Sequence, residues 1–282
     1  MINLSSLGKF DRRLHRSGVR NPWKGKAEAI RRIFMSEGTT HFGFEEIPVG
    51  EKARRVDAVF DSVADRYDLM NDLMSLGLHR VWKHFAVHLA RVRKDMRVLD
   101  LAAGTGDLSL RMAPMVGPGG RVVLADSNRP MLAKGRDRLL DKGHVGTIEA
   151  VRCDAQRLPF PDRTFDRVLI GFGLRNITHK ERALAEMRRV LRPSGMALVL
   201  EFSRLTLPLL AQAYDLWSFR ALPLLGRVVV GDADSYRYLA ESIRRHPDQE
   251  TLLATMREAG FEHCTYHNLC GGVVAVHKGY RL

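Results

Sequence analysis

Short apolar segments alternate with amphipathic ones along most of the chain. Segments rich in valine, leucine and isoleucine predict buried strands at residues 97–102, 121–126, 147–155, 165–172 and 195–203. Helix-spaced apolar residues predict helices before and between them, at residues 51–66, 70–92, 106–116, 129–142 and 179–192. Buried strands joined by helices are typical of a parallel sheet with right-handed crossovers, so we expect an α/β, doubly wound, Rossmann-like fold.

Both ends of the chain depart from this pattern. Two further β-rich runs, 263–269 and 272–280, are separated by a short glycine turn and predict an antiparallel hairpin that completes the sheet. Residues 1–38 carry nine Lys or Arg against three Asp or Glu and show little periodicity. We therefore expect one domain at residues 39–282, preceded by a basic, disordered extension at 1–38.

Composition and charge exclude several classes of protein. The chain has a net charge of +13, but its basic residues are not interleaved with aromatic ones, so we expect no nucleic-acid partner. No apolar run approaches the ~20 residues that cross a bilayer. The cysteines Cys153, Cys264 and Cys270 lack the spacing of a zinc site or a disulfide framework, which indicates a reducing compartment and no metal.

A glycine-rich turn, LDLAAGTGD, follows the first strand of the predicted sheet. The turn comprises Gly104, Thr105 and Gly106. Its backbone can approach a ligand closely, and the next helix offers free N–H groups. Ser109 occupies the position of the third glycine of a dinucleotide-binding turn. Asp100 before the turn and Asp107 after it favour a positively charged ligand over a pyrophosphate, and S-adenosylmethionine carries an ammonium and a sulfonium.

Polar residues also end the next strands. Asp126 ends the second strand, where a carboxylate accepts hydrogen bonds from ribose hydroxyls. Asp154 and Ala155 follow the third strand, and we expect them to bracket the adenine. Gly171 ends the fourth strand, at the edge where the second substrate should bind. With the glycine turn, these residues predict a class I S-adenosylmethionine-dependent methyltransferase fold with an N-terminal helical lid.

Two longer segments give the chain a resemblance to a known family. YDLMNDLMSLGLHRVW (67–82) and RVLRPSGMALVLEFS (189–203) resemble signatures of the ubiquinone/menaquinone biosynthesis C-methyltransferases, the UbiE family. The resemblance covers residues 39–282 and includes THFGF, LPFPDRTFD, FGLRN and DADSYRYLAESIRRHPDQ. The chain departs at Ser194, where the family usually has a glycine, and at Gly171, where some members have a serine that contacts the cofactor.

The resemblance implies methyl transfer from S-adenosylmethionine to a ring carbon of a polyprenylated quinol, in menaquinone or ubiquinone biosynthesis. Carbon methylation needs an electron-rich ring, which forms when a neighbouring hydroxyl loses its proton. We expect Arg175 to stabilise the resulting phenolate and Asn176 to orient the ring oxygen. The candidate bases are Asp68, His79, Asp232 and Asp234, and the sequence does not select one.

Several alternatives stay open. The protein is either a C-methyltransferase, an O- or N-methyltransferase of a small aromatic, or a catalytically silent scaffold in a quinone-biosynthetic assembly. The substrate ring is a benzoquinol, a naphthoquinol or both, and the apolar segment 205–231 is suited to an isoprenoid tail. Peripheral membrane contact, a homodimer and a quinone-biosynthesis complex are open as well. We expect a cytoplasmic protein, or a mitochondrial one if residues 1–38 are a transit peptide rather than upstream sequence of a chain that starts at Met35.

Overall fold

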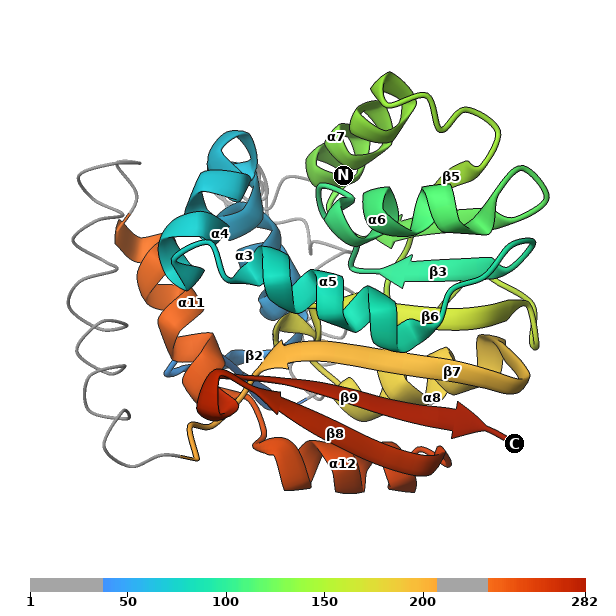
Figure 1. The fold of residues 1–282 in the computed structure, drawn as a ribbon. Helices are drawn as coiled ribbons and strands as arrows, with labels where there is room; N and C mark the ends of the chain where they lie inside the picture. Colours follow the sequence, from blue (N-terminus) through green and yellow to red (C-terminus); the bar gives the residue numbers. More distant parts are fainter. Residues whose placement is uncertain (1–37, 207–232) are drawn as a thin grey trace, which may run out of the picture.

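A twisted seven-stranded sheet forms the centre of the computed structural model, which describes residues 38–206 and 233–282 (Figure 1). The strands are β3 (Arg97–Leu101), β4 (Arg121–Asp126), β5 (Ile148–Arg152), β6 (Phe165–Gly171), β7 (Leu191–Phe202), β8 (Glu262–Leu269) and β9 (Val274–Arg281). Their order is β5-β4-β3-β6-β7-β9-β8. The first five strands are parallel, and β9 pairs antiparallel with both β7 and β8. The predicted parallel sheet and its C-terminal hairpin are therefore confirmed.

Helices cover both faces of the sheet, because successive strand residues point to opposite sides. Helices α5 (His79–Ala90), α6 (Asp107–Val116) and α7 (Arg129–Asp141) pack on the face that carries Val98. Helices α8 (Lys180–Val190) and α12 (Gln249–Glu258) pack on the face that carries Leu99. Val98 and Leu99 are both fully buried. Because helices cover both faces of the sheet, residues on both sides of each strand are apolar, and the strands form nearly continuous apolar runs in the sequence.

A further layer of helices lies at the carboxyl ends of the parallel strands (Figure 1). It consists of α3 (Val49–Val63), the 3₁₀ turn η1 (Ala64–Arg66), α4 (Tyr67–Ser75) and α11 (Ala233–Arg245). These helices share a separate apolar cluster that includes Val56, Met70, Tyr236 and Leu239. A small hairpin of β1 (Thr39–Phe42) and β2 (Glu45–Pro48) precedes α3, and the short 3₁₀ turns η2 (Leu174–Asn176) and η5 (Cys270–Gly272) complete the described elements.

Two predicted elements differ from the structure. The single helix predicted over residues 70–92 is wrong: α4 ends at Ser75, its C-cap Leu76 has a left-handed φ of 50°, and Gly77 follows with a φ of 78°. Apolar spacing continues through this break, so the pattern conceals it. The strand predicted at 195–203 begins instead at Leu191, because residues 192–195 form an irregular bulge opposite Asp166.

Some predictions fall outside the described residues. The extension at 1–37, most of the apolar segment 205–231 and the candidate base Asp232 belong to this group. Among the helices at 38–206 and 233–282, none combines the length and apolar character needed to cross a membrane. In the same ranges, no three His, Cys, Asp or Glu side chains lie together as metal ligands.

Candidate functional site

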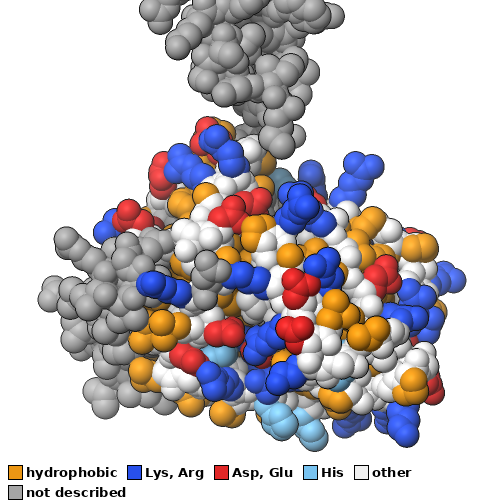
Figure 2. Space-filling model, turned by 90° about the horizontal axis from the view of Figure 1, so that it is seen from above, with side chains coloured by type: hydrophobic (Ala, Val, Ile, Leu, Met, Phe, Trp, Pro, Cys, Tyr) orange, Lys and Arg blue, Asp and Glu red, His pale blue; other side chains and the backbone are white. Residues whose placement is uncertain are grey.

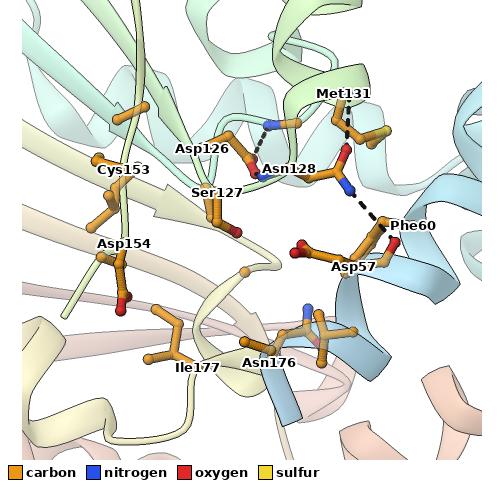
Figure 3. Close-up of a pocket in the computed structure, with 18 of the residues that line it drawn as sticks. Asp57, Phe60, Asp126, Ser127, Asn128, Met131, Cys153, Asp154, Asn176 and Ile177 are labelled. Carbon is orange, nitrogen blue, oxygen red and sulfur yellow. Dashed lines mark hydrogen bonds between the residues drawn. The ribbon is translucent and has the colours of Figure 1, made fainter. Parts of the chain in front are cut away.

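A pocket opens at the carboxyl ends of β3, β4, β5 and β6, beneath α3 (Figure 3). Five predicted cofactor residues line it: Gly104, Asp126, Asp154, Ala155 and Gly171. The parallel strand order brings these distant positions to one sheet edge, as the sequence predicted. Asp100, Thr105 and Gly106 are buried and are not among the lining residues.

Asp126 is fixed by backbone amides at the edge of this pocket. One carboxylate oxygen accepts a hydrogen bond from the N–H of Gly104 at 2.7 Å, and the other accepts from the N–H of Asn128 at 2.8 Å. Burial, with a smaller effect from Asp57, raises the pKa of the Asp126 carboxyl. Each carboxylate oxygen has a second lone pair, so the group can still accept from a ligand hydroxyl in the pocket.

The glycine turn is held against α7 by close backbone packing. A side chain at Gly135 of α7 would place its Cβ 2.8 Å from the carbonyl oxygen of Gly104 and 3.1 Å from the nitrogen of Gly106. Only a residue without Cβ lets the helix approach the turn this closely. Sequence reasoning missed Gly135, although a glycine inside an amphipathic helix is a signal of such an approach.

Asp100 lies behind the turn rather than in the pocket. Its carboxylate accepts hydrogen bonds from the N–H of Ser109 at 2.9 Å and from the Ser109 hydroxyl at 2.6 Å. Burial raises the pKa of Asp100 to about 7. Nearby, the Nζ of Lys83 lies 2.7 Å from the carboxylate of Asp107, which opens α6. The two acids that suggested a cationic ligand therefore also fix the helix that follows the turn.

Asn176 is the predicted catalytic residue that lines the pocket (Figure 3). The hydroxyl of Tyr238 on α11 donates to its Oδ1 at 3.0 Å. This contact leaves the Nδ2 of Asn176 available as a donor to a bound molecule. Arg175, one residue earlier, points elsewhere: its Nη1 donates to Glu201 at 2.8 Å and to the carbonyl of Phe172.

The candidate bases lie away from the pocket. His79 is buried, with its Nε2 2.9 Å from Asp72, and burial lowers its pKa. Asp68 is exposed and pairs with Arg138 at 3.5 Å. Asp234 is also exposed and pairs with Arg237 at 3.2 Å. None of the three is among the residues that line the pocket.

Helix α3 supplies pocket residues that no sequence motif indicated. Asp57 and Phe60 face the pocket from α3, opposite Asp126 (Figure 3). The Nδ2 of Asn128, next to Asp126 in the same loop, donates to the carboxylate of Asp61 at 2.8 Å. This bond ties α3 to the loop after β4, which makes α3 the roof of the site.

The comparison with protein families decides the class of the chain. The model of the ubiE/COQ5 methyltransferase family matches residues 49–281. The chain belongs to this family. Gly104, Asp126 and, from the roof helix α3, Asp57 line the candidate pocket of this family member.

Curated relatives resemble the chain over most of its length. A protein of Ectopseudomonas mendocina (strain ymp), named ubiquinone/menaquinone biosynthesis C-methyltransferase UbiE, is 59% identical over 251 residues, which are 89% of this chain and 98% of that protein. A protein of the same name from Pseudomonas aeruginosa (strain LESB58) is 58% identical over 246 residues, covering 87% and 96% of the two chains.

Solved structures of lower identity show the fold. A SAM-dependent methyltransferase from Aquifex aeolicus has a TM-score of 0.55 at 15% identity, over 76% of this chain and 98% of that chain. Another, from Thermotoga maritima, has a TM-score of 0.57 at 18% identity, over 80% and 99%. The predicted class I methyltransferase fold is confirmed, and S-adenosylmethionine is the cofactor of this fold and family.

Proposed function

We propose that this chain transfers a methyl group from S-adenosylmethionine to a ring carbon of a polyprenylated quinol. The substrate is demethylmenaquinol, 2-methoxy-6-polyprenyl-1,4-benzoquinol, or both. The relatives at 58–59% identity that carry the UbiE name support the quinol. The observation that carries the proposal is that Asn176 lines the same pocket as Gly171 at the end of β6, so a polar amide is available to a substrate at this edge of the sheet.

The cofactor fits the residues of the pocket. Asp126 would accept hydrogen bonds from the ribose hydroxyls, and Asp154 would accept from the adenine amine. The glycine turn lets the backbone approach the ligand closely. When bound, S-adenosylmethionine supplies an electrophilic methyl group on a positively charged sulfur.

The chain's own residues prepare the quinol for attack. Methyl transfer to the ring carbon would release the neutral thioether S-adenosylhomocysteine, and the methylated carbon would then give its proton to a base or to water, which restores the aromatic ring. Asn176 would donate through Nδ2 to a quinol oxygen and hold the ring within about 3–3.5 Å of the methyl group. Arg175 does not line the pocket and its Nη1 is paired with Glu201, but its buried Nε has no hydrogen-bond partner in the described part of the chain, and through this group it would stabilise the phenolate. The candidate bases are still Asp68, His79, Asp232 and Asp234. Asp68, His79 and Asp234 do not line the pocket, so each would need a movement of its helix to reach it.

Product analysis tests the reaction. The protein is incubated with methyl-labelled S-adenosylmethionine and each reduced quinol, and NMR identifies the methylated atom. Label on a ring carbon supports the proposal. Label on oxygen or nitrogen would favour the alternative methyltransferase. Calorimetric titration without any binding of S-adenosylmethionine would favour the silent scaffold.

The setting of the enzyme follows from its substrate. We propose a cytoplasmic protein with a peripheral contact at the inner face of the membrane, because a polyprenyl tail partitions into lipid at ~0.8 kcal/mol per CH₂. A mitochondrial-matrix location replaces this one if residues 1–38 are a transit peptide. In either setting, residues 39–282 form the methyltransferase domain, and a homodimer or a quinone-biosynthesis complex is compatible with it.

A further inference from the structure

The turn between α4 and α5 exposes a group of apolar side chains. Leu76 is 71% exposed and Val81 is 63% exposed, and Leu78 between them is also exposed. Leu69, two helical turns before Leu76 on α4, belongs to the same set of exposed residues. We call these four residues the α4–α5 tip. Large apolar side chains this exposed, close together in one hairpin, mark an interaction surface.

The α4–α5 tip is braced from within. The Ser75 hydroxyl donates to the carbonyl of Asn71 at 2.7 Å and accepts from the N–H of His79 at 3.2 Å. In addition, the Nε2 of His79 is hydrogen-bonded to the carboxylate of Asp72 at 2.9 Å. The short polar side chains of residues 67–82 thus hold the hairpin in one shape and keep its leucines turned outward. Leu76 itself adopts a left-handed backbone conformation that is unfavourable for leucine. The stability of the fold therefore does not explain a leucine at this position.

A cleft with basic walls adjoins the α4–α5 tip. Leu69 lines it, together with Arg66 and, from α7, Lys134 and Arg138. Asp68 is the acidic residue in this lining. Tyr67 also lines the cleft, and it lines the cofactor pocket as well. Helix α4 therefore runs from an exposed apolar end to the methyltransferase site, with positive charge beside it.

We propose that the α4–α5 tip inserts into the head-group layer of an anionic phospholipid bilayer, with the basic cleft facing lipid phosphates. The polyprenylated ring then passes along α4, by way of Leu69 and Tyr67, into the pocket. This inference rests on the proposed function, since a substrate without an isoprenoid tail would not need a lipid surface.

Charge favours a bilayer over a second copy of this chain. Without the extension 1–38, whose nine Lys or Arg and three Asp or Glu supply +6 of the net +13, the chain still carries +7, so two copies repel each other, whereas an anionic bilayer attracts each copy. On the face seen in Figure 2, hydrophobic side chains lie among basic and acidic ones, and around Leu69 the cleft residues Arg66, Lys134 and Arg138 outnumber the acidic Asp68. Apolar residues flanked by Lys and Arg are the pattern of a surface that lies in the membrane interface.

Vesicle binding by the full chain tests the surface. The probes are vesicles of phosphatidylcholine alone and of equal parts phosphatidylcholine and phosphatidylglycerol, separated by sedimentation. The test variant is Leu76→Asp/Val81→Asp. The control is Val145→Asp, which changes an apolar side chain that is 73% exposed in the turn after α7. We expect the protein and its control to bind the anionic vesicles, and the test variant to bind about tenfold more weakly or worse.

Equal binding by the test variant and the control would overturn the proposal, because another surface would then hold the protein. A change of oligomeric state in the test variant with unchanged vesicle binding would overturn it in favour of a contact between copies. Since the substituted side chains are exposed, thermal unfolding should be unchanged, and a folded test variant is expected.

Activity separates this inference from the proposed function. With a quinol whose tail is short enough to dissolve in water, the test variant should methylate as fast as the control. With a long-chain quinol embedded in anionic vesicles, it should be slower by about the same factor as its loss of binding. If the test variant and the control methylated the embedded quinol at equal rates, the proposed membrane surface would be wrong, while the proposed function would stand. Failure of every variant, including the unmodified chain, on both quinols would overturn the proposed function.

Discussion

The guanidinium of Arg175 and the carboxylate of Glu201 form an ion pair at 2.8 Å in which both side chains are almost completely buried. Glu201 also accepts from the backbone N–H groups of Arg175 at 3.2 Å and of Phe202 at 2.9 Å. The carboxylate at the end of β7 thus fixes the loop after β6, which carries Asn176. Arg175, which the sequence predicted as catalytic, therefore also stabilises the fold through its buried ion pair.

Arg175→Met is expected to lower the free energy of unfolding by about 3–5 kcal/mol, because Glu201 would keep a buried charge without its partner. Arg175→Met/Glu201→Gln should recover most of that loss, since the neutral amide still accepts from the backbone. Urea unfolding measures both. If Arg175 stabilises the phenolate, turnover stays low in the double variant and rises with pH, because the quinol then ionises unaided. Full recovery of turnover in the double variant would leave Arg175 a structural role only.

Tyr238→Phe should lower turnover by about tenfold while leaving cofactor affinity unchanged. The variant keeps the ring that stacks on Phe42 at 4.1 Å but loses the hydroxyl that orients Asn176. A net hydrogen bond is worth about 1 kcal/mol, so the amide would no longer be held in one orientation. Tyr266→Phe, which removes a hydroxyl bound to Glu250 far from the pocket, is the matched control. Steady-state kinetics measure the turnover of both variants. An equal loss of turnover in Tyr238→Phe and Tyr266→Phe would contradict the role of Tyr238.

Asp126→Asn is expected to weaken S-adenosylmethionine binding by about 1–3 kcal/mol, because the ribose would lose a charged hydrogen-bond acceptor. Asparagine keeps one oxygen for the N–H of Gly104 or Asn128, so the loop should retain much of its shape. Calorimetric titration measures the affinity, with Glu149→Gln on the exposed side of β5 as the control. An unchanged dissociation constant would remove Asp126 from the cofactor site.

Asp100 should make the cofactor-free protein less stable as pH rises from about 4 to about 7. Burial raises its native pKa to about 7, whereas the unfolded carboxyl titrates near ~3.9. In this window the native state binds the proton and the unfolded state does not, so the free energy of unfolding falls with rising pH. Asp100→Asn removes the titration and keeps an acceptor for Ser109. Relative to the unmodified chain, it should gain stability between pH 5 and pH 7; a constant difference across that range would contradict the shift.

Ser194→Gly should stabilise the protein by about 1 kcal/mol. Ser194 has a left-handed φ of 63° and is exposed, so its side chain contributes strain and little packing. The neighbouring Gly195 is the control, since a Cβ there would lie 2.7 Å from the carbonyl oxygen of Arg192 and Gly195→Ala should destabilise. Thermal unfolding of both variants checks the pair. A loss of stability in Ser194→Gly would show that the serine makes a contact worth more than its strain.

The sequence predicted most of the sheet and five candidate cofactor residues that line the pocket, because both depend on local patterns. Continuous apolar runs located β3 to β7, and strand ends located Asp126 and Asp154. The break at Leu76 was missed because a leucine in a left-handed conformation has no composition signal.

The roof of the site could not be predicted in the same way. Asp57 reaches the pocket only through the packing of α3 across the strand ends, which is set by contacts distant in sequence, such as that between Asn128 and Asp61. Asp68 and His79 were predicted from the short polar groups on one helix face, and in the structure His79 contacts Asp72 of its own hairpin and Asp68 pairs with Arg138 of α7.

The position of β9 has a consequence for the synthesis of the protein. β9 lies between β7 and β8, and in the described sheet β8 pairs with β9. As the chain leaves the ribosome, β8 therefore emerges before the strand that will join it to the rest. Arg281, at the end of β9, donates to the carbonyls of Arg188, Arg189 and Leu191, so the start of β7 gains these hydrogen bonds only when β9 is present. The nascent domain cannot close its sheet before β9 has left the ribosome, so its folding is completed only after that strand is available.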